Sequence, residues 1–503
     1  MDLELQKERL EGYRSGAPLL LTQEETAETV VPDYCPDIAR IVSVKGCLCL
    51  RNRSVTDGRL TASGSVRLTL LYMAEGGQGL RSLDYSIPFE QSAALGEDCV
   101  DACLEGGVCA VEARLLNPRK LFTRVNLEWR ATPYCPAVIE TCGDIAEQKE
   151  YAIQMLCDRQ DVSLLRFAGS REFVLADELI LPGGRDAIGE LLSSRVALRL
   201  TEARSLGTKV VLKGVACLSL LYTAEDAKLC SYAEELPFSQ ILDSSAQDGE
   251  YTVSAALSLS DSEIHSEDEG RAVSVRLSLS AFLTLREQKT VYCITDLYST
   301  SYELDAQFET LTLPQQPEVS TVTQAVREQL DTGTQVQCVL GTDVCFSGAQ
   351  VRQNGDHAEV HTTATVSVLY LDESNAPMSI ERRLDVTAET GAEQAARVSV
   401  GEVCAGDLTA TVNAGGVELR FPVEFTLVSV GMPECRCLTA LSAEKAEGGD
   451  GASLVLRSLK EGETLWDIAK QYRTTAEEIL SANELTDSAI LEAGRMLLIP
   501  RTR

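Results

Sequence analysis

The chain has 503 residues, of which 44% are hydrophobic, and its 76 acidic against 45 basic residues give a formal net charge of −31. This length accommodates about three or four domains. The excess of acid argues against nucleic acid and anionic membrane surfaces as partners. No stretch approaches the roughly 18 consecutive apolar residues of a transmembrane helix, so no membrane span is predicted.

The first sixteen residues, MDLELQKERLEGYRSG, are mostly polar and charged. They predict a short helical segment over residues 1–15 and lack the apolar core of a secretory signal. We therefore expect a cytoplasmic protein. Its 17 cysteines are then expected to be reduced thiols rather than disulfides.

Three alternating apolar segments, each ending in tyrosine, recur at offsets of 150 and 148 residues: Gly64–Tyr72, Gly214–Tyr222 and Thr362–Tyr370. A glutamate follows each tyrosine at the third position: Glu75, Glu225 and Glu373. Period-2 alternation before a polar turn predicts the first strand of a hairpin. The expected partner strands contain Ile87–Phe89, Leu236–Phe238 and Leu384, respectively.

The predicted fold class is mainly β, with three sandwich-like repeat units followed by a small α+β domain. Further alternating strands at Ala272–Leu285 and Gly416–Val430 fill the second halves of two units. The units are placed near residues 16–160, 165–315 and 318–440. Short helices are predicted at Ala146–Asp158 and Val322–Asp331, and a flexible linker at Ala443–Ser453. The sequence leaves open whether the units pack together or hang as beads, and also leaves the oligomeric state open.

The last segment, residues 454–500, has its own pattern. Leu454–Leu456 predicts a strand, and Gly462 lies in a polar turn after it. Thr464 and Thr475 are natural helix N-caps, each followed by apolar residues at helical spacing. Met496–Ile499 predicts a closing strand, so the expected order is strand, helix, helix, strand.

These residues resemble the LysM domain. The family usually binds glycans that contain N-acetylglucosamine, such as peptidoglycan or chitin, and some members dock proteins instead. The resemblance places a binding groove at Gly462, Glu463, Thr464, Leu465, Ile490 and Leu491. The chain departs from the family pattern at Glu463, where aspartate is usual, and at Ala493, where proline is usual.

The repeat resembles the SPOCS domain of spore-coat-associated proteins, and the segment VPDYCPDIARI at Val31–Ile41 carries this resemblance most clearly. Such repeats before one C-terminal LysM domain are similar to the SipL family of spore coat morphogenesis proteins. This similarity implies a protein of the mother-cell cytosol at the forespore surface, docked through its LysM domain on the coat ATPase SpoIVA. The alternative is a protein that binds peptidoglycan or a lipid-linked precursor through N-acetylglucosamine.

The sequence predicts no catalytic residues, no metal site and no cofactor. The three histidines, His265, His357 and His361, lack ligand-type neighbours at a familiar spacing. The pairs Cys47/Cys49 and Cys435/Cys437 are interpreted either as small buried residues or as half of a zinc site, which would need two more ligands. A cell-wall hydrolase would need a nucleophile or a metal triad, which the sequence does not offer.

Overall fold

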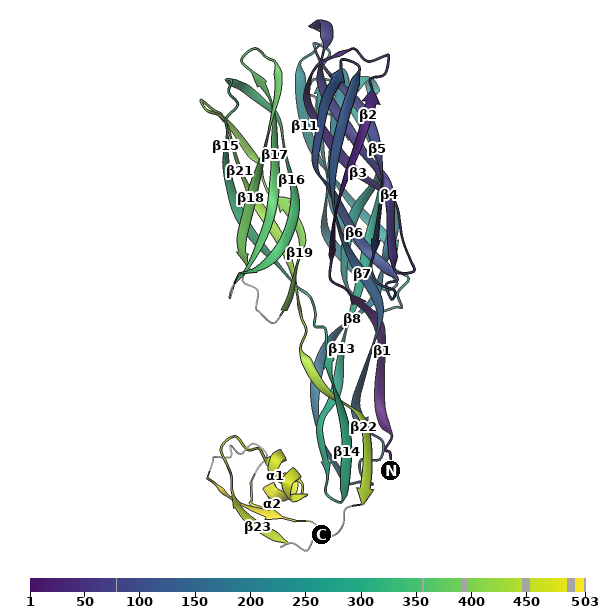
Figure 1. Ribbon diagram of the computed structural model, residues 1–503, viewed down its shortest axis with the longest axis vertical. Coiled ribbons are helices and arrows are strands. Elements are labelled where there is room, and N and C mark those ends of the chain that lie inside the picture. Colours follow the sequence, from purple (N-terminus) through teal and green to yellow (C-terminus); the bar gives the residue numbers. More distant parts are fainter. Residues whose placement is uncertain (78, 355–356, 391–395, 446–452, 486–493, 502–503) are drawn as a thin grey trace.

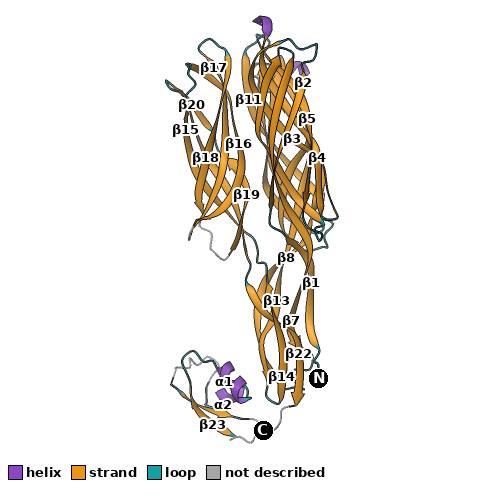
Figure 2. Ribbon diagram, in the orientation of Figure 1, coloured by secondary structure: helices purple, strands orange, loops and turns teal. Residues whose placement is uncertain are grey.

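The structure is a computed structural model that describes the chain except for residues 78, 355–356, 391–395, 446–452, 486–493 and 502–503. It is mainly β, as predicted, and the α-helices of the described part, α1 and α2, lie in the C-terminal domain (Figure 2). Three β-sandwiches stand beside one another above a narrower stem, and the C-terminal domain lies against that stem (Figure 1).

Sandwich 1 packs a three-stranded sheet on strands of a larger sheet. The three-stranded sheet consists of β3 (Ile38–Thr56), β4 (Arg59–Ala74) and β5 (Leu80–Ala94). The facing strands are β2 (Leu19–Val30), β6 (Asp101–Asn117) and the first part of β7 (Lys120–Ile145). A 3-10 turn, η1 (Glu75–Gly77), follows β4. The core between the two sheets includes Trp129 and Tyr72, both almost completely buried.

Sandwiches 2 and 3 have the same arrangement. In sandwich 2 the small sheet is β9 (Glu190–Leu206), β10 (Lys209–Thr223) and β11 (Leu229–Asp243). It faces the later part of β8 (Ile153–Ile180), β12 (Thr252–Glu267) and the first part of β13 (Ala272–Ser299), with η2 (Asp268–Gly270) between the last two. In sandwich 3 the small sheet is β16 (Val336–Asn354), β17 (His357–Asp372) and β18 (Pro377–Thr390). It faces β15 (Glu318–Leu330), β19 (Ala396–Ala405), β20 (Thr409–Asn413) and β21 (Gly416–Gly431).

The three predicted hairpins are confirmed. Each alternating segment lies in the middle strand of a small sheet, and its tyrosine is buried. The register pairs Val66 with Ile87, Ala216 with Leu236, and Ala364 with Leu384. The alternation of apolar and polar residues therefore indicates a strand that packs one of its faces against the core of its own sandwich.

The stem consists of three antiparallel ribbons around one core. Ribbon 1 pairs β1 (Leu5–Ser15) with the end of β7, ribbon 2 pairs the start of β8 with the end of β13, and ribbon 3 pairs β14 (Tyr302–Thr312) with β22 (Glu434–Lys445). Each ribbon thus joins the strands that enter and leave one sandwich. The buried stem core draws on all three ribbons, with Leu10, Cys142, Ile153, Val162, Val291, Cys293, Leu297, Cys435, Cys437 and Leu441.

The sandwiches share a further apolar cluster, which settles that they pack together rather than hang as beads. The cluster takes equivalent residues from the three small sheets: Val42, Leu192 and Leu340, and Leu71, Leu221 and Leu369. Beside it, Asp343 of sandwich 3 forms ion pairs with Lys45 of sandwich 1 (3.4 Å) and with Arg195 of sandwich 2. Burial lowers the pKa of Lys45, although neighbouring anionic groups oppose the shift.

The helix predicted over residues 1–15 is wrong, because Leu5–Ser15 forms strand β1. This strand pairs with β7 along its whole length and meets β8 at Tyr13 and Leu165. At Gly12 an added Cβ would come within 2.7 Å of the carbonyl oxygen of Leu165. Tertiary pairing thus overrides the helix propensity of this charged segment.

The two short helices predicted outside the C-terminal domain are also wrong. Residues 146–152 form a turn, and β8 begins at Ile153. The other helix falls within strand β15. Val322, Val326 and Leu330 are four residues apart, so they share one face of a strand as readily as one face of a helix. Pairing with β21 decides the outcome.

The predicted unit boundaries omit the stem. Strand β8 runs without a break through the boundary placed between residues 160 and 165, because one strand serves both the stem and sandwich 2. Of the predicted linker Ala443–Ser453, residues 443–445 belong to β22, and residues 446–452 lie outside the described part of the chain.

Candidate functional site

The C-terminal domain consists of β23 (Leu454–Ser458), α1 (Leu465–Tyr472), α2 (Ala476–Ala482) and β24 (Met496–Pro500). The two strands pair antiparallel, with Val455 opposite Ile499. A small core of five fully buried residues joins the strands to the helices: Ile468, Ala469, Ile479, Leu497 and Ile499.

Both helices begin with a capping box. Thr464 accepts a hydrogen bond from the backbone N–H of Asp467 (3.2 Å), and the Asp467 carboxylate accepts one from the backbone N–H of Thr464 (3.0 Å). Thr475 and Glu478 repeat this arrangement at α2. The reciprocal bonds satisfy backbone donors that a helix start leaves free. They therefore fix where the turn before α1 ends.

Four of the predicted groove residues are consecutive in the chain: Gly462, Glu463 and Thr464 precede α1, and Leu465 is its first residue. Gly462 has φ +77°, a left-handed conformation that favours glycine, and it is exposed. Thr464 is also exposed, and Leu465 is half-buried. The other two predicted residues, Ile490 and Leu491, lie outside the described residues, as does Ala493. The structure thus describes four of the six predicted residues, and the groove itself stays a prediction.

Glu463 has an internal role that the sequence did not reveal. Its carboxylate pairs with Arg457 of β23 at 2.6 Å, with both side chains 15% exposed, and it accepts a hydrogen bond from the backbone N–H of Lys460 (3.2 Å). Arg457 also donates to Gln471 of α1 (2.5 Å). The glutamate, whose side chain is longer than that of the usual aspartate, therefore holds the turn against β23. Its carboxylate serves the fold of the domain.

The C-terminal domain is attached to ribbon 2 of the stem by polar contacts of α1. The indole N–H of Trp466 donates to Asp296 (2.8 Å), and the ammonium of Lys470 donates to the other oxygen of the same carboxylate (2.5 Å). A further ion pair reaches ribbon 3, where Glu303 of β14 pairs with Arg473, the residue after α1, at 2.9 Å. Burial alone would raise the pKa of Asp296, but the hydrogen bonds from Lys470 and Trp466 outweigh it and hold the pKa below the ordinary 3.8. The sequence assigned Trp466 to the core of its own domain and could not find a partner 170 residues upstream.

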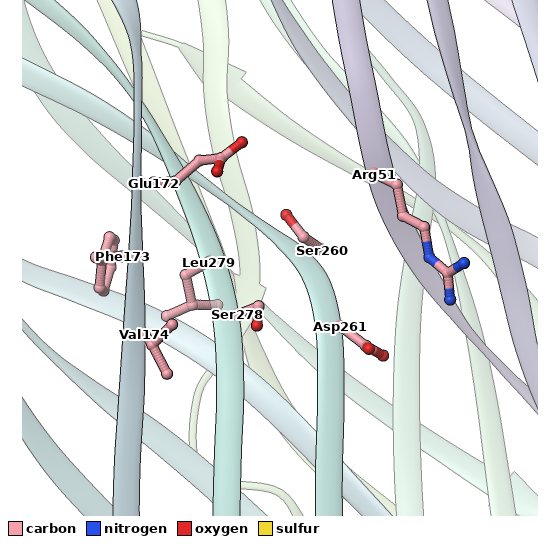
Figure 3. A pocket seen from close by; sticks show the side chains of 8 residues that line it. All are labelled: Arg51, Glu172, Phe173, Val174, Ser260, Asp261, Ser278 and Leu279. Atoms are coloured by element: carbon pink, nitrogen blue, oxygen red, sulfur yellow. The ribbon is translucent and has the colours of Figure 1, made fainter.

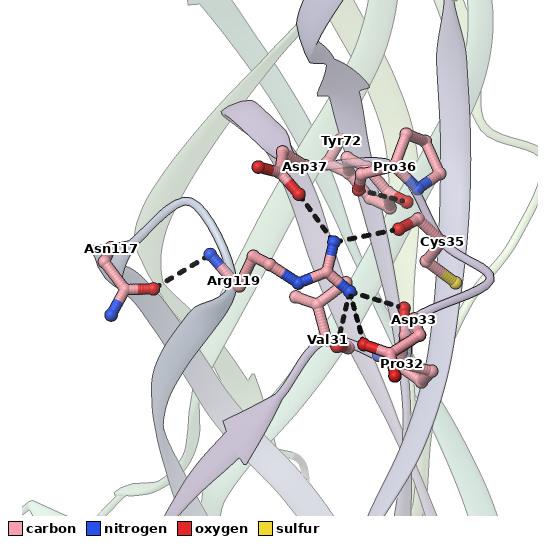
Figure 4. A network of polar contacts seen from close by, with 9 residues as sticks. All are labelled: Val31, Pro32, Asp33, Cys35, Pro36, Asp37, Tyr72, Asn117 and Arg119. Carbon is pink, nitrogen blue, oxygen red and sulfur yellow. Dashed lines mark hydrogen bonds and ion pairs between the residues drawn. The ribbon is translucent and has the colours of Figure 1, made fainter.

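A second polar network holds the segment Val31–Ile41, which the sequence singled out (Figure 4). The guanidinium of Arg119 donates to oxygens along the loop: Asp37 (2.5 Å), Pro32 (2.9 Å), Val31 (3.1 Å), Cys35 (3.3 Å) and Asp33 (3.4 Å). Tyr72 donates to the carbonyl of Pro36 (3.4 Å). Tyr34, at the tip of the loop, is 87% exposed.

Sandwich 2 has an equivalent loop, supported by hydrogen bonds from an equivalent arginine and tyrosine, but the residues at its tip differ. Arg271 donates to the carbonyl of Arg185 (2.8 Å), and Tyr222 donates to that of Asp186 (3.1 Å). Gly183 and Gly184 stand where sandwich 1 has Asp33 and Tyr34. The tip residues are therefore not needed to build the loop.

Replacing Arg119 by leucine is expected to raise amide hydrogen exchange in residues 31–37 by about tenfold or more, because the loop oxygens lose a shared charged donor. The equivalent Arg271→Leu change is expected to affect residues 181–187 less, since the structure gives Arg271 one such hydrogen bond. The tip exchange Asp33→Gly with Tyr34→Gly serves as a control that leaves exchange elsewhere in sandwich 1 unchanged. Equal effects of the two arginine changes would contradict this interpretation.

A cleft between sandwiches 1 and 2 has a volume of about 400 Å³ (Figure 3). Its lining is Arg51, Glu172, Phe173, Val174, Ser260, Asp261, Ser278 and Leu279. Asp261 is already paired with Arg67 of sandwich 1 at 2.9 Å. Asp261 therefore takes part in a contact between the sandwiches, and Glu172 is the other carboxylate of the lining.

All 17 cysteines are free thiols. Cys435 and Cys437 are both buried in the stem core beside Cys142 and Cys293, whereas in the other pair Cys49 is buried and Cys47 is exposed. In the described part of the chain, no group of three or more His, Cys, Asp or Glu residues could hold a metal ion. The burial of both cysteines of the stem pair agrees with the interpretation of small buried residues.

In the described residues, no helix combines the length and apolar character that crossing a membrane requires.

Comparison with family models identifies two parts of the chain. The model of the LysM domain matches residues 459–500, and the model described as SipL, SPOCS domain, matches residues 37–115. No curated protein and no solved structure matches the chain. Both matched domains are binding domains rather than catalytic ones. The chain therefore carries a SPOCS domain of the SipL type within sandwich 1 and a LysM domain at its C-terminal end.

Proposed function

We propose that this protein is a non-enzymatic scaffold of endospore coat assembly. The observation that carries the proposal is the presence of a SipL-type SPOCS domain and a LysM domain on one chain. In this function the protein acts in the mother-cell cytosol, and its LysM domain docks on a SpoIVA-like ATPase at the forespore surface.

The scaffold would consist of three diverged copies of the SPOCS domain. The family match covers the first copy, from the start of β3 through most of β6. Support for the other two comes from the equivalent strands of their small sheets, which lie 150 and 148 residues apart, and from the equivalent stem ribbons. Shared packing of the copies would give the LysM domain a rigid support.

The contact with the partner would use the turn before α1. Gly462 and Thr464 are exposed there, and half-buried Leu465 supplies apolar surface. We propose that Ile490 and Leu491 complete this surface. A small apolar centre with a polar rim is the usual composition of a protein contact.

The test is a binding assay between the purified protein and a SpoIVA-like ATPase. Thr464→Asp in the intact chain is expected to weaken binding about tenfold or more, because it places a charge in the contact while aspartate preserves the helix cap. Thr475→Asp makes the same change at the cap of α2 and is the matched control. Removal of residues 453–503 should abolish binding. Undiminished binding of the truncated chain would show that the LysM domain is not the docking element.

The second candidate is recognition of a glycan that contains N-acetylglucosamine, from peptidoglycan or from a lipid-linked precursor. The LysM match and the exposed turn around Gly462 favour it. Titration of the intact chain with chitin oligomers distinguishes the two candidates. Saturable binding that Thr464→Asp removes would support the glycan function. Absence of binding to the oligomers, together with binding to the ATPase, would exclude it.

A further inference from the structure

We propose that ribbon 2 of the stem is a docking site for the LysM domain of the same chain, built around Asp296 and Tyr298. The site holds the domain as a fixed head and leaves the turn with Gly462 and Thr464 exposed. This inference goes beyond the proposed function, because it does not depend on what the LysM domain binds.

Asp296 is oriented for this contact by the stem. Strand β13 has a β-bulge at Thr295, where the register against β8 skips one residue. The carboxylate of Asp296 accepts the backbone N–H of Leu297 (2.9 Å), which fixes its direction. The carboxylate also accepts hydrogen bonds from the side chains of Trp466 and Lys470 of α1. Three donors on a carboxylate that is 26% exposed form a partly desolvated site, in which a charge-assisted pair is stronger than at an open surface.

Tyr298 joins the apolar core of the LysM domain. It is 6% exposed and belongs to the same cluster as Ile468 and Ile479. Its ring meets that of Trp466 edge-on, with 4.9 Å between the ring centroids. Its hydroxyl donates to the carbonyl of fully buried Thr474 (2.9 Å). A stem side chain thus supplies part of the core of another domain.

The other two ribbons provide an internal comparison. Each outgoing strand has its bulge at an equivalent residue, Gly143, Thr295 or Thr439. The next residue is Asp144 in ribbon 1, Asp296 in ribbon 2 and Ala440 in ribbon 3.

Two positions further along, the chain has Ala146 just after β7, Tyr298 in β13 and Ser442 in β22. Asp144 accepts the N–H of Ile145 (2.8 Å), so ribbon 1 has the same bulge geometry. The bulge therefore forms without an aromatic residue two positions later. Ribbon 2 combines the acid with the tyrosine, and both side chains contact the LysM domain, whereas ribbon 3 contacts it through the ion pair of Glu303 with Arg473.

The contact divides the surface of the LysM domain. The α1 face with Trp466 and Lys470 is occupied by the stem, whereas Gly462 and Thr464 remain accessible. A partner therefore approaches the exposed turn while the domain stays attached, and the stem sets the direction from which it approaches.

Zero-length carbodiimide cross-linking of the intact protein tests this site. The reagent joins an amine to a carboxylate that is in direct contact, so the wild type is expected to give a Lys470–Asp296 cross-link, detected by peptide mass spectrometry. The Lys289–Glu8 pair of the stem, also at 2.5 Å, is the internal reference. Tyr298→Ala retains both reacting groups and is expected to lower the yield relative to this reference by about tenfold or more, because without the tyrosine ring and its hydrogen bond to Thr474 the LysM domain is mostly undocked.

Two further variants keep the test decisive. Asp144→Asn changes the equivalent bulge in ribbon 1 and should leave the Lys470–Asp296 yield unchanged. If Tyr298→Ala also lowers the reference cross-link, the milder Trp466→Phe change replaces it, since it removes the indole donor and keeps a ring. It too is expected to lower the relative yield. Absence of the wild-type cross-link, or a yield that neither variant lowers, would overturn the proposal. Cross-links between isotopically labelled and unlabelled copies would overturn it as well.

Discussion

Replacing Leu221 by aspartate is expected to separate the packed sandwiches and to cost about 3 to 5 kcal/mol, because it removes a buried leucine and leaves an unpaired charge in its place. Leu221 is 8% exposed in the cluster shared with Leu71 and Leu369 of the other two sandwiches. Its neighbours Leu220 and Tyr222 face the core of sandwich 2 instead. The change therefore acts on the contact between sandwiches and spares the inside of one.

Differential scanning calorimetry and small-angle X-ray scattering measure this effect. The variant is expected to unfold in separated transitions at lower temperature and to have a larger radius of gyration than the wild type. Ser219→Asp is the matched control, because Ser219 lies on the same face of β10 two residues earlier and is exposed. A variant with wild-type transitions would show that the shared cluster does not hold the sandwiches together.

Replacing Gly416 by alanine is expected to destabilise sandwich 3 by roughly 2 to 3 kcal/mol, through backbone strain and a steric clash. Gly416 begins β21 at φ +118°, which side chains rarely adopt. A Cβ would lie 2.2 Å from the carbonyl oxygen of Leu330, the last residue of β15. Residue 416 lies in β21 and the Leu330 carbonyl lies in β15, and these two strands are paired. Neither can move away from the other without loss of that pairing.

Gly415→Ala is the neighbouring control. An added Cβ at Gly415 meets its nearest neighbour, the side-chain oxygen of Asn413, at an ordinary distance of 3.6 Å. Chemical denaturation followed by hydrogen exchange in β15 and β21 separates the two variants. Comparable stabilities of the two would show that the backbone around Gly416 adapts to a side chain.

The SPOCS and LysM segments could be recognised from the sequence because their signals are local. Period-2 alternation reports a strand that packs one face on a core, and it located the hairpins at Tyr72, Tyr222 and Tyr370. Caps at Thr464 and Thr475 report helix starts through contacts within four residues. The family matches at residues 37–115 and 459–500 agree with these two segments.

Other assignments failed where the deciding contact is distant. The spacing of Val322, Val326 and Leu330 suits a helix and a strand equally, and pairing with β21, about 90 to 100 residues further along the chain, makes the segment a strand. The sequence assigned Trp466 to the core of a small domain, whereas the structure shows that it also contacts Asp296 and Tyr298 of the stem. The groove was predicted from a resemblance and stays a prediction, since the structure describes four of its six residues, three before α1 and Leu465 at its start.

The sequence by itself determined the mainly β class, the three hairpins and the two recognisable domains, because strand alternation, helix caps and turns depend on near neighbours. The tertiary structure decided that the sandwiches share an apolar cluster, that three ribbons form a stem, and that the LysM domain lies against this stem. The physical reason is visible in the Leu-Leu-Tyr run at residues 220–222. Alternation accounts for the apolar character of Leu220 and Tyr222, which face the core of their own sandwich. Leu221, between them, is apolar because it packs against apolar residues of the other two sandwiches.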